Sequence, residues 1–144
     1  MSNFLTVCVD ASIVVRLTIS QDDAAVKKLW SSWSSQGTHL VAPSLLFYEV
    51  TNGLYRQQKG GVLSPAFVRD ALDIALALPV ELFGDANLHR QARLLAETYR
   101  LPAAYDAHYL ALAERLGVDL WTADALLVKT LQPFGVGWVR LPEA

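Results

Sequence analysis

Short apolar stretches alternate with longer segments of helical periodicity along this whole sequence. The apolar stretches have the length of β-strands and lie at residues 5–9, 39–42, 80–83, 120–122 and 137–141. Strands that alternate with helices in this way are typical of a parallel sheet covered by helices on both faces. We therefore expect one three-layer α/β/α domain over residues 1–144, with its functional residues at the carboxyl ends of the strands.

Helix boundaries are marked by capping residues, glycines and prolines. Ser44, Ser64 with Pro65, and Asp85 are residues of the kind that begin helices, whereas Gly60 with Gly61 and Gly117 end them. Apolar residues recur at helical spacing between these boundaries. The predicted helices cover approximately residues 21–36, 44–58, 65–78, 86–99, 104–116 and 124–131.

The composition excludes several classes of protein. Apolar residues make up 53% of the chain and charged residues 18%, which excludes intrinsic disorder and a coiled coil. No apolar run reaches the roughly 18 residues of a membrane span. The formal net charge of −2 argues against coating nucleic acid through bulk charge, although it is compatible with a local basic patch. The apolar excess also suggests that a partner covers part of the surface.

Two features of the N-terminal segment bear on the compartment. The single cysteine, Cys8, lies in an apolar run, where a small buried thiol in a reducing compartment is expected. The segment has no basic region and only a short apolar stretch before Asp10, so no signal peptide is expected. We predict a cytoplasmic protein that has no contact with a membrane.

Four acidic residues stand at the ends of predicted elements. Asp10 follows the first strand and Asp124 follows the fourth. Glu49 lies in the second turn of the helix after strand two, and Asp106 lies in the first turn of the helix that leads into strand four. All four carboxylates should therefore meet at one rim of the sheet. Singly, each has an ordinary explanation, as a helix N-cap, a partner of the helix dipole or a solvated helix residue.

Together, the four carboxylates favour a metal site. Ionised carboxylates in one place repel each other, so either some are neutral or a cation lies among them. Mg²⁺ and Mn²⁺ accept all-oxygen sites of this kind. A site without His or Cys ligands favours hydrolysis of phosphate esters, for which a divalent ion activates water. His39, His89 and His108 share no metal-ligand spacing, and the last two are expected to be surface or packing residues on helices.

Other phosphate and acyl chemistries lack their motifs. The sequence contains no phosphate-binding glycine loop, no dinucleotide fingerprint and no serine nucleophile elbow. A phosphatase-type or phosphoaspartate domain normally needs a second acid beside the first-strand aspartate, but Val9, Ala11 and Ser12 stand there.

Five segments resemble PIN-domain ribonucleases, and among them the VapC-type toxins of prokaryotic toxin–antitoxin pairs. These segments are residues 9–12 (VDAS), 42–46 (APSLL), 48–52 (YEVTN), 105–113 (YDAHYLALA) and 122–124 (TAD). The resemblance implies a five-stranded parallel sheet in the order 3-2-1-4-5. It implies that Asp10, Glu49, Asp106 and Asp124 are catalytic and hold Mg²⁺ or Mn²⁺, with Ser12 and Thr122 in support. It also implies an RNA substrate, a small antitoxin as partner, and a homodimer.

Positive charge for an RNA substrate is available near the expected rim. The candidates for phosphate contacts are Arg16, Arg56, Lys59 and Arg69, each of which could equally be an ordinary surface charge. The helix over residues 44–58 is apolar around much of its girth, more than contact with a core requires, and this suggests that the antitoxin binds there.

The sequence thus predicts a metal-dependent endoribonuclease that acts as the toxin of a toxin–antitoxin pair. The alternative is a non-catalytic PIN-like module that binds RNA or protein. In such a module the acidic quartet would normally be broken, whereas in this chain it is complete.

Overall fold

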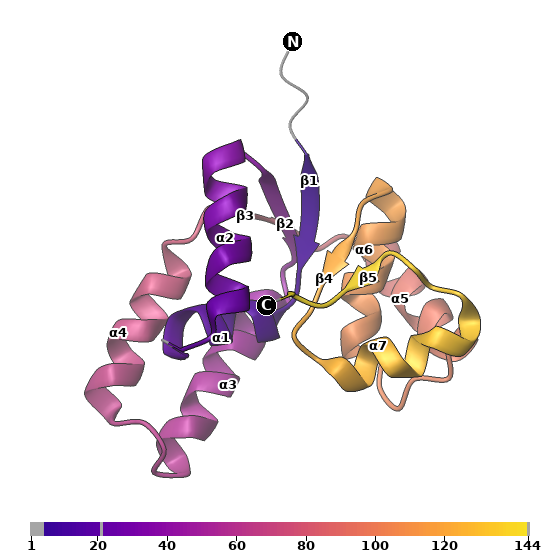
Figure 1. Cartoon of the computed structure of the whole chain (residues 1–144). Coiled ribbons are helices and arrows are strands. Elements are labelled where there is room, and N and C mark those ends of the chain that lie inside the picture. Colours follow the sequence, from indigo (N-terminus) through magenta and orange to yellow (C-terminus); the bar gives the residue numbers. More distant parts are fainter. Residues whose placement is uncertain (1–4, 21, 144) are drawn as a thin grey trace.

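The computed structural model describes residues 5–20 and 22–143 and contains a five-stranded sheet surrounded by helices (Figure 1). The strands are β1 (Thr6–Val9), β2 (His39–Pro43), β3 (Val80–Phe83), β4 (Leu120–Trp121) and β5 (Val139–Arg140). The helices are α1 (Ala11–Ile19), α2 (Ala24–Gln36), α3 (Leu46–Lys59), α4 (Pro65–Leu76), α5 (Ala86–Thr98), α6 (Tyr105–Leu116) and α7 (Ala125–Leu131), followed by a 3₁₀ turn, Gln132–Phe134.

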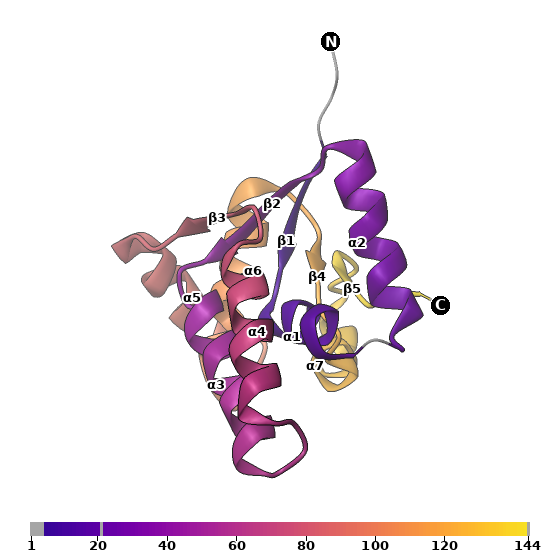
Figure 2. The same cartoon turned by 90° about the vertical axis from the view of Figure 1, so that its left-hand side faces the viewer.

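The sheet is parallel throughout, in the order β3-β2-β1-β4-β5. This confirms both the fold class and the strand order. Helix α6 packs on one face of the sheet with α5 behind it, while α2 covers the other face (Figure 2). The indole of Trp33 on α2 meets that of Trp121 on β4 at a centroid distance of 5.9 Å. The three layers are therefore joined by direct side-chain packing.

The core lies between β1 and α6. Val7, Cys8 and Val9 are all buried, and so is the run from Tyr109 to Ala113 on α6. The buried alanines of α6, Ala107, Ala111 and Ala113, let the helix lie close to the sheet. Cys8 is a buried free thiol whose pKa is raised far above its ordinary value by burial. It is thus an inert packing residue, as the sequence indicated.

The carboxyl ends of the strands lie between two groups of helices. The α3–α4 pair, together with α1, stands on one side, and α5, α6 and α7 stand on the other (Figure 1). No helix among the residues described is long and apolar enough to cross a membrane. The four predicted acids should therefore be found at these carboxyl ends, between the two groups of helices.

Several predicted boundaries were wrong by a few residues. Ser44 does not cap α3, because its backbone N–H continues the pairing of β2 with β3 by donating to the carbonyl of Phe83 at 2.7 Å. Leu45 takes the cap position without a side-chain bond. Asp23 caps α2, so this helix begins at Ala24, and the predicted start at residue 21 lies outside the described residues. The fourth and fifth strands are each only two residues long.

Candidate active site

Asp10 joins the end of β1 to the start of α1. Its Oδ1 accepts the backbone N–H of Ser12 at 3.0 Å and that of Ile13 at 3.4 Å, so it is an N-cap. The same Oδ1 accepts the Ser12 hydroxyl at 2.5 Å. These bonds all end on one oxygen, and capping therefore does not use Oδ2. The ordinary explanation of this residue as a helix cap is correct, and the capping bonds use only one of its two carboxylate oxygens.

Ser12 and Thr122 tie the ends of the two central strands together. The Ser12 hydroxyl accepts the backbone N–H of Ala123 at 2.8 Å and lies 3.3 Å from the hydroxyl of Thr122. Thr122 is fully buried, and its hydroxyl accepts the N–H of Asp124 at 3.0 Å. Since Ser12 also donates to Asp10, this network holds Asp10 and Asp124 in fixed relation. Ser12 and Thr122 therefore lie between Asp10 and Asp124 and bond to the backbone or side chain of these two acids or their neighbours.

Asp124 caps α7 in the same manner as Asp10 caps α1. Its Oδ1 accepts the N–H groups of Leu126 at 3.0 Å and of Leu127 at 3.2 Å. The residue itself is exposed. Its position at the carboxyl end of β4, the strand next to β1, brings it to the same rim as Asp10.

Glu49 is held by a residue that the sequence did not single out. The hydroxyl of Tyr109, a buried residue on α6, donates to Oε1 of Glu49 at 2.6 Å. The two residues are 60 positions apart, so only the packing of α3 near α6 brings them together. The available signal was spacing, because Tyr109 is one helical turn after Asp106 and thus on its face of the helix. This bond fixes the direction of the Glu49 carboxylate toward α6.

Asp106 is the electrostatic centre of the group. Burial raises the pKa of Asp106, and the nearby charge of Asp124 raises it further. Burial likewise raises the pKa of Asp10 to about 6, and the charge of Asp106 adds to this effect. For Glu49, burial and then the charge of Asp106 raise the pKa, while the bond from Tyr109 opposes the rise. The charge of Asp106 thus acts on Asp10 and Glu49, and that of Asp124 acts on Asp106.

The donor set suits a divalent cation that keeps much of its water. Among residues 5–20 and 22–143, no three His, Cys, Asp or Glu side chains are placed to chelate a single ion. Mg²⁺ commonly binds through one or two carboxylates and fills its other positions with water and substrate phosphate. Oxygen-only donors that raise one another's pKa fit such an ion, since a cation among them would relieve the repulsion.

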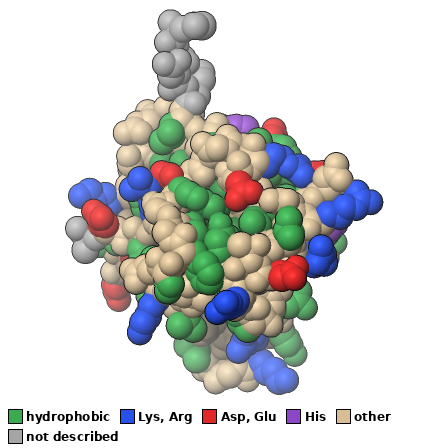
Figure 3. All heavy atoms as spheres, turned by 90° about the vertical axis from the view of Figure 1, so that its right-hand side faces the viewer, with side chains coloured by type: hydrophobic (Ala, Val, Ile, Leu, Met, Phe, Trp, Pro, Cys, Tyr) green, Lys and Arg blue, Asp and Glu red, His purple; other side chains and the backbone are tan. Residues whose placement is uncertain are grey.

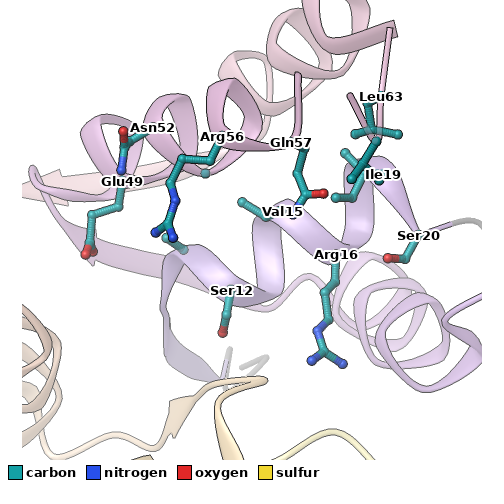
Figure 4. Close-up of a pocket in the computed structure, with 13 residues that line it drawn as sticks. Ser12, Val15, Arg16, Ile19, Ser20, Glu49, Asn52, Arg56, Gln57 and Leu63 are labelled. Carbon is teal, nitrogen blue, oxygen red and sulfur yellow. The ribbon is translucent and has the colours of Figure 1, made fainter. Parts of the chain in front are cut away.

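Two of the four predicted basic residues share a cleft with one of the four acids, Glu49. The cleft has a volume of about 710 Å³ between α1 and α3, and Ser12, Arg16, Glu49 and Arg56 are part of its lining. In Figure 4 the side chains of these four residues point to the same side. Arg16 lies 3.5 Å from Asp23, in an exposed ion pair of little stability. Lys59 and Arg69 lie outside the lining of this cleft, and Arg69 pairs with Asp70.

Charge is dispersed over the face that carries α5–α7 (Figure 3). On the face that carries α5–α7, basic and acidic side chains are scattered singly around a hydrophobic centre (Figure 3). His89 and His108, predicted as surface or packing residues, bond to each other at 2.9 Å between Nδ1 and Nε2. The basic residues that share a cleft with one of the acids are Arg16 and Arg56, beside Glu49.

Comparison with known proteins agrees with this geometry. The family model described as PIN domain matches residues 7–130. A Mycobacterium tuberculosis protein named Ribonuclease VapC3 is 34% identical over 125 residues, 85% of each chain. The crystal structure of Mycobacterium tuberculosis VapC20, a sarcin-ricin loop cleaving toxin, superposes with a TM-score of 0.68 at 20% identity, over 95% of this chain and 99% of that one.

A toxin–antitoxin complex from Klebsiella pneumoniae contains a similar fold, with a TM-score of 0.65 at 19% identity, over 95% of this chain and 98% of that one. At these identities the two solved structures support the fold alone, whereas the family model and the VapC3 relative cover most of the chain in sequence. The chain belongs to the PIN-domain family.

Proposed function

We propose that this protein is a metal-dependent endoribonuclease and the toxin of a toxin–antitoxin pair. The observation that carries the proposal is the placement of Asp10 and Asp124 after the neighbouring strands β1 and β4, with Glu49 held by Tyr109 on the helix that carries Asp106. Its relative of 34% identity is named a ribonuclease, which supports RNA as the substrate. The intact quartet argues against the alternative of a non-catalytic PIN-like binding module.

Different residues of the chain would bind the metal, bind the RNA and position the acids during hydrolysis. The four carboxylates would hold Mg²⁺ or Mn²⁺, which when bound supplies activation of water and neutralises charge on the phosphate. Arg16 and Arg56, in the cleft beside Glu49, would bind phosphates of the RNA backbone. Ser12 and Thr122 would keep Asp10 and Asp124 at a fixed separation. Lys59 and Arg69, outside that cleft, remain predictions for more distant phosphates.

Induced expression in bacterial cells tests this function. We expect growth arrest and accumulation of RNA fragments with defined new ends, which sequencing of RNA termini would map. Asp124→Asn, which can keep the cap of α7 through its amide oxygen, should abolish both effects. Equal growth arrest and equal fragment ends with the variant would contradict a catalytic role of the quartet.

Tyr109 should act as a positioning residue for Glu49. Tyr109→Phe removes the hydroxyl that donates to Glu49 and keeps the shape of the buried ring. We expect the Mn²⁺ concentration for half-maximal cleavage to rise about tenfold, as is common when a group that orients a metal ligand is lost. The rate at saturating Mn²⁺ should change little. Tyr99→Phe, at the end of α5, is the matched control, and an unchanged Mn²⁺ dependence in Tyr109→Phe would refute this role.

The partner surface is proposed to lie on α3. Leu46, Val50 and Leu54 form the buried stripe of this helix, whereas Tyr48 and Tyr55 are 77% and 53% exposed. A groove of about 740 Å³ runs beside these tyrosines and is also lined by Phe47 and Leu82. A short amphipathic helix or an extended segment of an antitoxin would bury this surface. The similar fold in a toxin–antitoxin complex supports such a partner.

Replacing Tyr55 by Asp should weaken the complex with the antitoxin. The change places an unpaired charge against an apolar surface and leaves the acidic quartet untouched. We expect loss of co-purification of the co-expressed antitoxin, with unchanged circular dichroism of the toxin. Leu94→Asp, an equally drastic change at an exposed position of α5, should retain the antitoxin. If Tyr55→Asp folds normally and binds as tightly as the wild type, α3 is not the interface.

Assembly and location are further proposals. We propose a homodimer that forms on a surface other than this groove, in the cytoplasm, where both RNA and a reducing environment for the buried Cys8 are present. Sedimentation of the purified chain would measure the oligomeric state.

A further inference from the structure

A third and smaller cavity is lined by residues of the two helices that carry Glu49 and Asp106. It has a volume of about 300 Å³ and is formed where α3, α5 and α6 meet the end of β3. Its lining includes the rings of Tyr48, Tyr105, His89 and His108, with Phe83 and Leu88 among its apolar residues. Tyr48 precedes Glu49 and Tyr105 precedes Asp106 in the chain. The same two helices thus present an acid to the rim and an aromatic ring to the cavity.

The two tyrosines are unusually exposed for aromatic side chains. Tyr105 is 63% exposed and Tyr48 is 77% exposed, although each lies at the edge of an apolar cavity. The Tyr109 hydroxyl donates to Glu49, whereas none of the contacts described above uses the hydroxyl of Tyr48 or Tyr105. Exposed aromatic faces beside a phosphodiester site are the usual platforms on which the bases of single-stranded nucleic acids stack.

The histidine pair gives the cavity a polar side with a defined hydrogen-bond direction. His108 Nδ1 lies 2.8 Å from the carbonyl oxygen of Ala104, which can only accept, so this nitrogen carries the proton. In the neutral pair, His108 Nε2 then accepts from His89 Nδ1 at 2.9 Å. The remaining nitrogen, His89 Nε2, is consequently an acceptor. This suits a partner with an amino group or ring N–H at its edge.

We infer that this cavity binds one base of the RNA substrate, next to the cleaved phosphodiester, between the rings of Tyr48 and Tyr105 and the His89–His108 pair. This inference rests on the proposed ribonuclease function. A base has two apolar faces and a polar edge, and the cavity offers apolar walls, aromatic rings and an imidazole acceptor. His108 lies two residues after Asp106 on α6, so the cavity and the acidic site are formed in part by the same helix.

A base fits the observations better than a protein segment does. A partner helix or a second copy of the chain would need a long apolar groove, such as the one beside Tyr55, whereas this cavity is smaller and carries a polar pair. The chain would thereby gain a preference for the base at one position of its RNA. Tyr48, Tyr105, His89 and His108 are accordingly proposed as specificity-determining residues.

Binding can be tested without any cleavage. In an NMR titration of the isolated chain without a divalent metal, adenosine 5′-monophosphate should shift the ring signals of Tyr48, Tyr105 and His89. Ribose 5-phosphate, which has the same phosphate but no base, should leave them in place. Tyr105→Leu and His89→Ala should each weaken nucleotide binding about tenfold, in the range that stacking contributes. His39→Ala, at the amino end of β2, should not.

A cleavage experiment places the cavity relative to the reaction. One RNA is compared with versions that carry a single abasic ribose at successive positions around the cleaved bond. We expect KM to rise about tenfold at one position for the wild type, and no further rise when Tyr105→Leu is combined with that abasic site.

The outcomes separate the two proposals. If no RNA is cleaved by the wild type but the nucleotide still shifts these rings and ribose 5-phosphate does not, the ribonuclease proposal fails and base binding stands. Equal shifts from both ligands would overturn the base-binding inference. So would ring signals that respond only to protein concentration or to an added antitoxin, since these would show that protein covers the cavity. Additive losses from the abasic site and Tyr105→Leu would also overturn it.

Discussion

Asp106→Asn should reduce RNA cleavage by at least about 100-fold, the scale on which loss of one group that stabilises a charged transition state is felt. Asp106 is the acid whose charge acts on Asp10 and Glu49 and is itself acted on by Asp124. Removing it takes away a metal ligand at the centre of the group. The initial rate of cleavage of a labelled RNA at saturating Mn²⁺ measures this loss.

The matched control for this change is Asp73→Asn, which neutralises an exposed carboxylate on α4 that is not part of the acidic quartet. It should retain the wild-type rate. Asp106→Asn should also fold normally, because its side chain caps no helix and the cap position of α6 belongs to Ala104. A folded Asp106→Asn variant that cleaves within threefold of the wild-type rate would remove Asp106 from the site.

Asp10→Asn should make the metal-free protein more stable than the metal-free wild type at pH 7. Burial raises the pKa of Asp10 from its ordinary 3.8 to about 6 in the folded chain. The ionised form is thus disfavoured by folding, at a cost of about 1–3 kcal/mol for a shift of this size. Asparagine carries no charge and keeps an oxygen that can accept the N–H groups of Ser12 and Ile13.

The stabilisation by Asp10→Asn should depend on pH. As the pH rises from about 4 to about 6, the unfolded Asp10 loses its proton while the folded one keeps it, so the wild type loses stability over this window. The gain from Asp10→Asn should therefore be full above pH 6 and vanish below pH 4. Urea unfolding in EDTA at several pH values measures it. An apo variant clearly less stable than the apo wild type at pH 7 would indicate that Asp10 is only a helix cap.

Mn²⁺ should stabilise the wild type more than Asp10→Asn. A cation that binds only the folded chain raises its stability in proportion to the logarithm of its concentration above the dissociation constant. Wild type should therefore gain in melting temperature with Mn²⁺, whereas Asp10→Asn should gain less, because it lacks one ligand.

Most of the fold could be predicted from the sequence because its signals are local, although helix α1, which Asp10 caps, was not among the predicted helices. The buried strands are followed by polar residues. Ser64 caps α4 and Asp85 caps α5, as their residue types predict. The placement of Asp10 and Asp124 needed only one further rule, that parallel strands share a carboxyl edge. The strand order, by contrast, came from family resemblance, since hydrophobic pattern alone does not say which strands are neighbours.

Contacts between distant helices could not be predicted. The bond from Tyr109 to Glu49 depends on how α3 approaches α6, and the pairing of His89 with His108 depends on how α5 lies against α6. Ser44 looked like a cap because its residue type favours that role. The pairing of its backbone with Phe83 on the neighbouring strand overrides this local preference.

Cleavage of a labelled single-stranded RNA by the purified chain, in Mn²⁺, in Mg²⁺ and in EDTA, tests most directly whether the four acids form a metal-dependent ribonuclease site. Wild type and Asp10→Asn are compared at the same protein concentration. The account predicts cleavage by the wild type with either metal, none in EDTA, recovery when Mn²⁺ is restored in excess, and none with Asp10→Asn under any condition. Cleavage that persists undiminished in EDTA, or that Asp10→Asn retains, would contradict it.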